Sequence, residues 1–314
     1  MSEVGELRRT KTFTDMKTKS LLAAMMAAAL SSNFVACSDD DDPFSGGGSG
    51  IESNAIVINV KEPGTFQQEF ENITSRYDGS SKLNTMVVKG NLNGDDISYL
   101  ETAESRNDIH VDFEHNVYLD ISEIQIVEST YEGKQYPANH LHGNFRNYIV
   151  TKLPKNIKVI DNTQFSRLVD VSNLFNEGLQ EIGDNAFYSA EFENEVNISF
   201  PTSLKKIGSG AFAGTTNLQS IVIPHNIELG DGAFASSFNL KYVELNGIEV
   251  ISEGCFGSMQ SDLDISIPNV KQIKDEAFRK TYQNYSGLIV INVKAEDLKD
   301  LEEIGVNAFR GVKK

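Results

Sequence analysis

A six-residue phrase returns seven times between Ile160 and Phe309. Each copy begins with Ile or Leu and ends with Phe; four copies have Gly second and five have Ala fifth. The copies are IDNTQF (160–165), IGDNAF (182–187), IGSGAF (207–212), LGDGAF (229–234), ISEGCF (251–256), IKDEAF (273–278) and IGVNAF (304–309). Their starts are 22, 25, 22, 22, 22 and 31 residues apart. Such a period predicts a solenoid, in which each unit buries its apolar face only against neighbouring units.

A second pattern lies between the phrases. Leu218–Pro224 reads L-x-x-I-x-I-P, and related runs are VNISFP (196–201), LKYVEL (240–245), LDISIP (263–268) and LIVINV (288–293). Alternation ending at proline predicts a short strand. One strand in about 22 residues matches the leucine-rich-repeat period of roughly 20 to 29. We therefore predict a leucine-rich-repeat-like solenoid with one short parallel strand per turn and irregular or short helical segments on the other face.

Each position of the phrase has a mechanical interpretation. The first Ile or Leu points into the core, and the Gly suits a turn that needs positive φ. Ala fits where two backbones approach, and each Phe stacks on the Phe of the next turn. Cys255 replaces Ala in one copy and is expected to be a small, buried, inert thiol.

The I-G-x-x-A-F phrase followed by an L-x-x-I-x-I-P strand resembles the BspA-like leucine-rich repeats (LRR_5 type), which are common in surface proteins of Bacteroides-type bacteria. The resemblance covers about residues 86–314. It implies a leucine-rich-repeat fold and an adhesive or recognition role, with host matrix proteins among the ligands proposed for such proteins.

Residues 1–36 are interpreted as a signal peptide whose true start is Met16. Lys17 and Lys19 precede the apolar run 21–30, which is too short for the roughly 20 residues that span a bilayer. The small residue before Cys37 resembles a bacterial lipobox, which implies that Cys37 is lipidated. The alternative is a secretory signal without lipid, in which this cysteine is incidental.

Residues 37–50 form a predicted tether. Four aspartates (39–42) and the SGGGSG tract (45–50) are typical of an extended, flexible chain. An acidic run behind a lipidated cysteine also resembles the export signal of Bacteroides-type surface lipoproteins. Together these features predict an outer-membrane lipoprotein at the cell surface that contacts the membrane only through its lipid.

Residues 51–150 are predicted to form an N-terminal cap and divergent first repeats, and residues 151–314 the leucine-rich repeats. A cap is needed because the end of a solenoid exposes a strand edge and an apolar face. Expected elements are strands at 56–60, 85–89 and 117–122, a helix at 65–73 started by Thr65, a helix ending near Glu104, and a worn phrase around Phe145.

The last repeat departs from the period. The 31-residue gap includes the charged run Ala295–Glu303, for which we predict a helical turn, and the chain stops soon after Phe309. Either the tail to Lys314 caps the last turn, or the coding sequence once continued.

No pattern indicates catalysis or a cofactor. His140 and His142 form a weak metal pair that is better interpreted as part of a solvated loop. Carboxylates fall mostly in turns, where solvation explains them, and no Gly-rich phosphate loop follows a strand. A formal charge of −17 argues against a nucleic-acid partner and favours a soluble monomer. We therefore predict a non-enzyme without cofactor or metal.

The exposed face of the predicted sheet is the candidate binding surface. Side chains alternate along a strand, so residues between the inward Ile and Leu positions point outward. They are Asn197, Ser199, Ser220, Val222, Tyr242, Glu244, Asp264, Ser266, Val290 and Asn292.

Several functions compete for this surface. The leading hypothesis is adhesion or binding to a protein partner of host or bacterial origin. The alternative is a glycan-binding accessory protein for nutrient capture, although sugar sites stack on exposed aromatics and these rows offer only Tyr242. A hydrolase, a structural envelope role and a solvated face without a ligand are further alternatives.

Overall fold

A computed structural model describes residues 55–77, 82–105, 112–169, 175–280 and 289–313. These residues belong to one compact unit, Ser53–Lys314. The predicted signal peptide, Cys37 and the tether lie outside the described residues. Among the described residues, no helix has the length and apolar character needed to cross a membrane.

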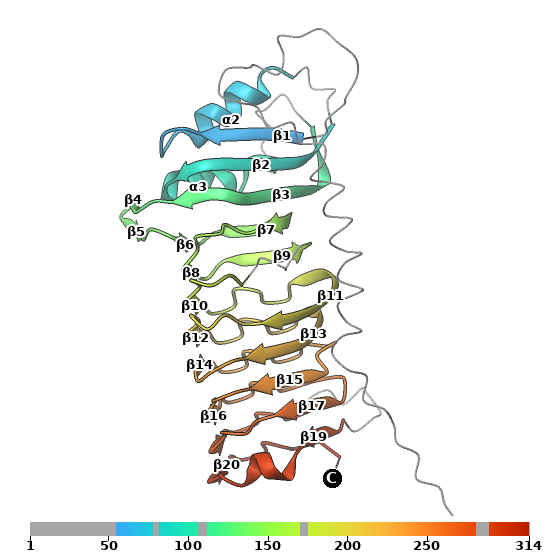
Figure 1. Cartoon of the computed structure of the whole chain (residues 1–314). Coiled ribbons are helices and arrows are strands. Elements are labelled where there is room, and N and C mark those ends of the chain that lie inside the picture. Colours follow the sequence, from blue (N-terminus) through green and yellow to red (C-terminus); the bar gives the residue numbers. More distant parts are fainter. Residues whose placement is uncertain (1–54, 78–81, 106–111, 170–174, 281–288, 314) are drawn as a thin grey trace, which may run out of the picture. The chain divides into compact units, whose positions relative to one another are not determined.

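A ten-stranded sheet runs through the whole unit, and every neighbouring pair of its strands is parallel. Its strands follow one another in sequence order, as the stacked arrows in Figure 1 show. The predicted solenoid is thereby confirmed. The strands are β1 (Ala55–Val60), β2 (Lys82–Leu92), β3 (Asp112–Ile126), β7 (Asn144–Lys152), β9 (Gln164–Leu168), β11 (Glu191–Ser199), β13 (Thr216–Ile223), β15 (Tyr242–Leu245), β17 (Leu263–Ser266) and β19 (Ile291–Val293).

From residue 140 onward, each turn also contributes a second, two-residue strand that was not predicted. These strands form a five-stranded and a three-stranded parallel sheet on the other side of the solenoid. From β8 (Val159–Ile160) onward, each ends with the first residue of a phrase, so Ile160 pairs with Ile182 and Ile273 with Ile304. They are β6 (His140–Leu141), β8 (Val159–Ile160), β10 (Glu181–Ile182), β12 (Lys206–Ile207), β14 (Glu228–Leu229), β16 (Val250–Ile251), β18 (Gln272–Ile273) and β20 (Glu303–Ile304).

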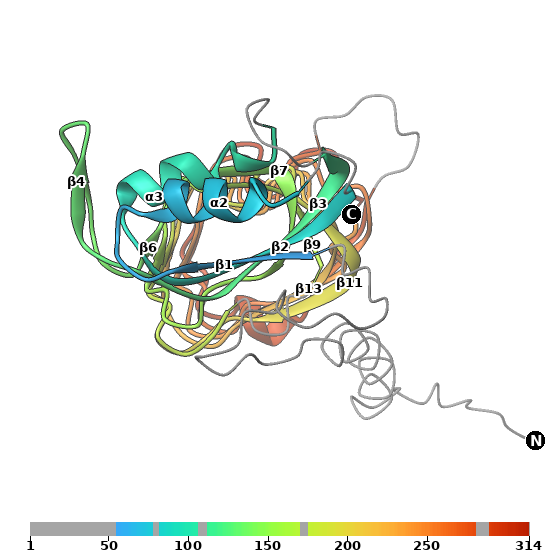
Figure 2. The ribbon, with the colours of Figure 1, turned by 90° about the horizontal axis from the view of Figure 1, so that it is seen from above.

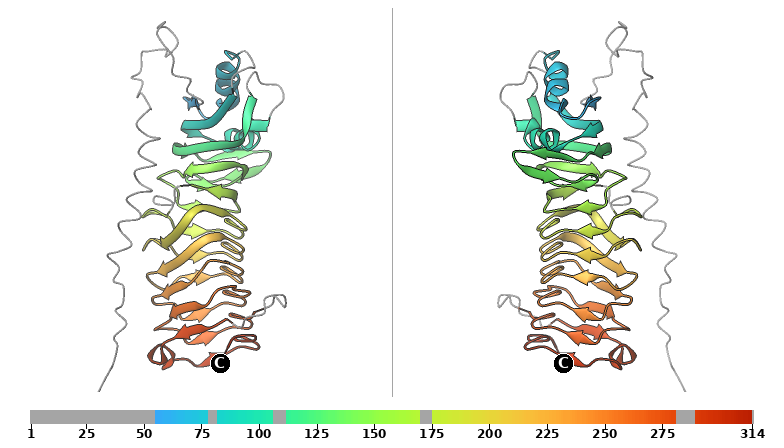
Figure 3. Two further views of the ribbon diagram at one scale, coloured as in Figure 1. Left: turned by 90° about the vertical axis from the view of Figure 1, so that its right-hand side faces the viewer. Right: turned by 90° about the vertical axis from the view of Figure 1, so that its left-hand side faces the viewer.

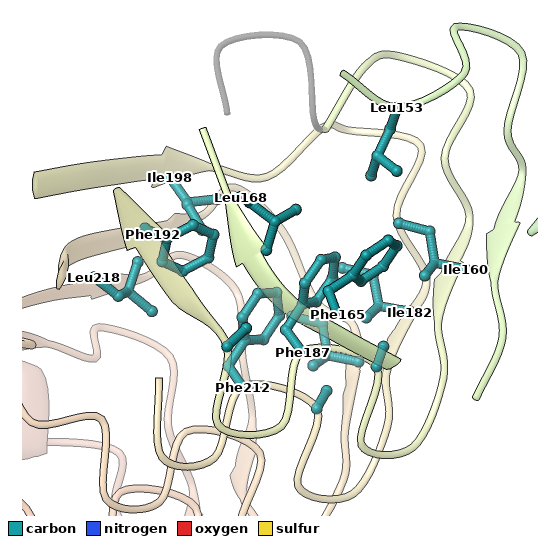
Figure 4. Close-up of a cluster of buried hydrophobic side chains, with 14 of the residues drawn as sticks. Leu153, Ile160, Phe165, Leu168, Ile182, Phe187, Phe192, Ile198, Phe212 and Leu218 are labelled. Atoms are coloured by element: carbon teal, nitrogen blue, oxygen red, sulfur yellow. The ribbon is translucent and has the colours of Figure 1, made fainter. Parts of the chain in front are cut away.

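The phenylalanines of the phrases stack in one column, as predicted. Successive ring centroids are 4.9 to 5.9 Å apart and the planes differ by at most 16°. Phe145 of the worn phrase begins the column and Phe309 ends it. The turns stack at regular intervals (Figure 3), and Figure 4 shows Phe165, Phe187 and Phe212 beside the aliphatic core. The core is therefore one continuous apolar axis.

The glycine of the phrase does not have the predicted positive φ. Positive φ falls two residues later, for example at Gly210 (62°) and Gly232 (62°). The phrase glycine is needed for space instead: a Cβ on Gly183 would lie 2.9 Å from the carbonyl carbon of Asp161. The ladder of two-residue strands brings successive backbones this close, which sequence reasoning did not include.

The residues that lengthen the irregular repeats have definite places. Glu191 pairs with Thr216 and Val196 with Leu218, so the three extra residues of the 25-residue repeat form a bulge within β11. In the repeat before the last, six residues separate Phe256 from Leu263. In the last repeat, twelve residues separate Phe278 from Ile291, which pairs with Leu263. The helical turn predicted in 295–303 is a 3-10 helix, η2 (Ala295–Leu298).

Two α-helices lie on one side of the sheet at its N-terminal end, α2 (Phe66–Thr74) and α3 (Gly94–Leu100), followed by the 3-10 helix η1 (Ala103–Ser105) (Figure 2). Thr65 occupies the N-cap position of α2, but its side chain makes no capping bond. The carboxylate of Asp96 caps α2 instead, accepting from the backbone N–H of Phe66 at 2.8 Å. The predicted Thr65 cap is therefore wrong.

A hairpin of β4 (Ser129–Tyr131) and β5 (Lys134–Tyr136) projects from the same end (Figure 2). At the other end, Val312 pairs with Ile289 in an isolated parallel bridge. That tail still leaves Ile304, Val306 and Phe309 exposed by 56%, 68% and 36%.

Candidate binding surface

The outer face of the ten-stranded sheet presents the side chains that the alternation assigned to it. In β15, Val243 and Leu245 are buried while Tyr242 and Glu244 are exposed. Of the ten predicted surface residues, six are exposed (Asn197, Ser199, Tyr242, Glu244, Asp264, Asn292) and four are half-buried (Ser220, Val222, Ser266, Val290). None of them belongs to the core.

The strand register arranges these residues in two rows along the solenoid axis. The first row runs Asn197, Ser220, Tyr242, Asp264, Asn292. The second runs Ser199, Val222, Glu244, Ser266.

Val290 lies outside both rows, although alternation within LIVINV (288–293) gives it the same outward orientation as Asn292. Asp264 pairs with Asn292, so Val290 lies two residues earlier and its N–H donates to Asp262 Oδ1 at 2.8 Å. The extra residues before β19 set this register, and sequence spacing alone could not show on which side of the strand they lie.

Hydrogen bonds along the rows orient several side chains. Ser220 Oγ donates to Asn197 Oδ1 at 2.5 Å, and Asn292 Nδ2 donates to Asp264 Oδ1 at 2.6 Å. Ser266 Oγ donates to the buried carboxylate of Asp297 in η2 at 3.1 Å. Part of the face is therefore held in place before any partner arrives, which lowers the entropy lost on binding.

Charge is distributed unevenly along this face. Between β2 and β11, neighbouring strands form three ion pairs: Lys89 with Glu123 at 3.2 Å, Lys152 with Asp120 at 3.6 Å and Arg167 with Glu191 at 3.8 Å. Between β15 and β17, Glu244 and Asp264 have no cationic partner among the described residues; amides of Asn246 and Asn292 bond them instead. The C-terminal half of the face is consequently anionic.

The bulge of β11 adds to this anionic surface and was not assigned from sequence. Glu193, Asn194 and Glu195 are all exposed. The only sequence signal was the 25-residue spacing, which gives the number of extra residues but not the strand that holds them.

A hollow of about 720 Å³ lies on the other side, where the ladder of short strands is interrupted between β14 and β16. His225 and Lys205 are among its lining residues. The His225 ring bonds through Nε2 to the Leu204 carbonyl at 2.8 Å. No nucleophile–base pair accompanies it among the described residues, so the sheet face remains the better candidate surface.

Two residues with reactive side chains, Cys255 and His142, are both buried. Cys255 is fully buried, and burial raises the pKa of its thiol, in agreement with the predicted inert cysteine. The prediction of a solvated loop is wrong for His142, which is 9% exposed and packs edge-on against Tyr136 at 4.0 Å. Burial lowers the pKa of His142 to about 4. The described residues contain no group of three His, Cys, Asp or Glu arranged to hold a metal ion.

The stacked turns, the phenylalanine column and the exposed parallel sheet define a leucine-rich-repeat solenoid. The family model described as BspA type leucine-rich repeat region matches residues 141–245 and 180–314, which together are more than half of the chain. The chain belongs to this family. No curated protein matches it.

Several solved structures are similar at low identity. A leucine-rich repeat protein from Bacteroides ovatus is 18% identical, with a TM-score of 0.42 and coverage of 81% of this chain and 67% of that one. A leucine-rich cell surface protein from Faecalibacterium prausnitzii is 16% identical, with a TM-score of 0.31 and 79% of both chains covered. The pneumococcal vaccine antigen PcpA is 17% identical, with a TM-score of 0.30, and the alignment covers 75% of this chain and 60% of PcpA.

Proposed function

We propose that this protein is a non-enzymatic binding module whose ten-stranded sheet recognises a protein partner on a host or bacterial surface. The observation that carries the proposal is the pair of in-register rows on the exposed face. Repeat solenoids offer extended surfaces that can vary in sequence while the buried axis preserves the fold. The protein acts as a monomer in this proposal, because its net charge of −17 opposes self-association.

The proposal includes a lipid anchor at Cys37 that holds the solenoid at the outer face of the outer membrane. The support is the apolar run 21–30 before that cysteine and the acidic, Gly-rich segment after it. Protease treatment of intact cells tests the location. Loss of the solenoid from intact cells is expected, and its protection would place the protein inside the outer membrane.

Binding to a protein partner can be separated from binding to a glycan. Full chain carrying Cys37→Ser is applied to intact host and bacterial cells that have been treated with protease, with glycosidases or with neither. We expect saturable binding that protease abolishes and glycosidases leave unchanged. Loss of binding after glycosidase treatment would favour the glycan alternative, and the absence of saturable binding would reject both.

Two variants link such binding to the sheet. Ser199→Trp with Ser220→Trp places bulky side chains in both rows of the ten-stranded sheet. Val250→Trp adds the same side chain at an exposed position of β16, on the opposite side of the solenoid. The first variant is expected to weaken binding at least about tenfold, since a bulky side chain prevents close packing. The second should bind as wild type does. Equal binding by both would show that the sheet is not the binding surface.

A further inference from the structure

Tyr242 is the middle residue of the first row, at the beginning of the anionic half of the sheet face. It is 55% exposed, compared with 48% for Tyr188 and 36% for Phe309. Asp264 lies directly opposite it on β17, at the strand spacing of about 4.8 Å. Glu244 follows two residues later on the same face, roughly 6.5 Å along the strand. The strand register therefore makes two carboxylate-bearing residues the neighbours of one exposed tyrosine.

This arrangement suits a cation. An ammonium or guanidinium group within about 6 Å of a tyrosine ring is attracted by the negative face of the ring. Neighbouring carboxylates strengthen that attraction, and neither Glu244 nor Asp264 is neutralised by a cation among the described residues. The three ion pairs toward the N-terminus show what the same face looks like when its carboxylates have partners within the chain.

We infer that the sheet between β11 and β17 docks a basic polypeptide segment that places a Lys or Arg over Tyr242, between Glu244 and Asp264. This inference rests on the proposed protein-binding function and adds the chemistry of the partner. Glu193 and Glu195 on the β11 bulge extend the anionic surface, so further positive residues of the segment are accommodated.

A peptide of defined charge tests the inference directly. A short fluorescent peptide of alternating Arg and Ser is titrated with the full chain at physiological ionic strength, beside analogues with Gln or Glu in place of Arg. We expect saturable binding of the Arg peptide only. Binding of the Gln analogue with equal affinity, or no binding of the Arg peptide, would overturn the inference.

Matched variants separate a local site from the general negative field. Glu244→Gln with Asp264→Asn should weaken binding about tenfold, since two ionic contacts of about 0.7 kcal/mol each are lost. Tyr242→Ala, at unchanged charge, should weaken it about threefold. Glu228→Gln with Glu253→Gln removes the same charge from exposed positions outside the ten-stranded sheet, and a change below about twofold is expected. Equal losses from the two double variants would reject a local site.

The failure of this inference differs from the failure of the proposed function. Any protein partner found on cells is compared with both variant types. If Ser199→Trp with Ser220→Trp blocks its binding but Glu244→Gln with Asp264→Asn does not, the sheet is a binding surface and the partner is not basic there.

Discussion

Glycine has two separate physical roles in each repeat. The phrase glycine, such as Gly208, lies against the preceding turn: a Cβ there would come within 2.6 Å of the Gly183 carbonyl carbon. Two residues later the backbone has positive φ, as at Gly254 (60°), where a Cβ would meet nothing within 4 Å. Steric crowding governs the first position and backbone conformation the second.

These roles predict opposite tolerances. Gly208→Ala should lower the free energy of unfolding by about 3 kcal/mol or more, because two backbones of the ladder must separate. Gly254→Asn should cost less than about 1 kcal/mol, because Asn tolerates the left-handed region and already occupies it at Asn185 and Asn307. Urea denaturation of both variants measures the difference. Similar losses would show that the close approach at Gly208 is relieved cheaply.

The sequence could not distinguish these two roles at the phrase glycine. Crowding and positive φ both select glycine, so its recurrence at Gly183 and Gly208 fits either explanation. The fourth position of the phrase held the better signal. Asn185, Glu276 and Asn307 occupy it in other copies, and all have positive φ.

Buried His142 predicts a dependence of stability on pH. The pKa is about 4 in the folded chain, mainly through burial, against an ordinary value of 6.5. The unfolded chain therefore binds the extra proton between these values, and stability falls as pH drops from 6.5 toward 4. The full effect is on the order of 3 kcal/mol.

The variant His142→Leu isolates this term. Its free energy of unfolding should lose about 3 kcal/mol less than wild type between pH 7 and pH 4, since all other titrating groups are shared. Parallel pH profiles for wild type and His142→Leu would contradict a buried neutral imidazole.

At the scale of elements, one buried carboxylate, that of Asp96, links the N-termini of helices α2 and α3. Asp96 is 2% exposed and accepts hydrogen bonds from the backbone N–H groups of Gly64, Phe66 and Asn93 at 2.7, 2.8 and 2.9 Å. It thus caps α2 and completes the capping box of α3. Carboxylates at helix N-termini are stabilising because they accept hydrogen bonds from free N–H groups and attract the positive end of the helix dipole.

Two adjacent aspartates allow a controlled test of that cap. Asp96→Asn should destabilise the fold by about 2 to 3 kcal/mol, because an amide cannot accept all three bonds. Asp95→Asn makes the same chemical change at an exposed residue of the same turn and should cost less than about 0.5 kcal/mol. Hydrogen exchange of α2 should accelerate in the first variant alone. Equal exchange in both would mean that α2 does not depend on Asp96.

Element prediction succeeded where the signal was local and periodic. Eight of the ten sheet strands and the helical turn at η2 (Ala295–Leu298) follow from alternation and composition within a short window, whereas β7 and β9 were not predicted as strands. The short ladder was missed because two residues have no period to detect. The α2 cap was missed because Asp96 is 31 residues from Thr65 in sequence, and one sequence does not show which distant polar group completes a cap.

At the scale of the whole described unit, the sequence predicts the buried stack of the solenoid better than the arrangement of side chains on the exposed sheet. The repeated Phe and Ile positions must be apolar in every turn, so they reveal the stacking and the direction in which the outer side chains point. The outer residues are free to vary, and only their register decides which of them become neighbours. Val290 shows this limit, because alternation indicates that it points outward but only the strand register places it outside both rows.

A solenoid whose turns contact only their neighbours should respond to a lost side chain according to its position along the axis. Phe234 is fully buried between Phe212 and Phe256, with ring centroids 5.3 and 5.6 Å away. Among the described residues, Phe309 stacks only on Phe278, at 5.2 Å, and it is 36% exposed. We expect Phe234→Ala to cost about 4 kcal/mol, because it opens a cavity and uncouples the turns on either side.

Phe309→Ala, in contrast, should cost only about 1 to 2 kcal/mol, because it removes one stacked contact and leaves little cavity. Hydrogen exchange should show fraying confined to β20 and its neighbours, whereas Phe234→Ala should loosen β13 and β15 on both sides of the cavity. Equal destabilisation by the two variants, or exchange that accelerates uniformly along the chain, would mean that the unit unfolds as one block. In that case the nearest-neighbour description of its stability would be wrong.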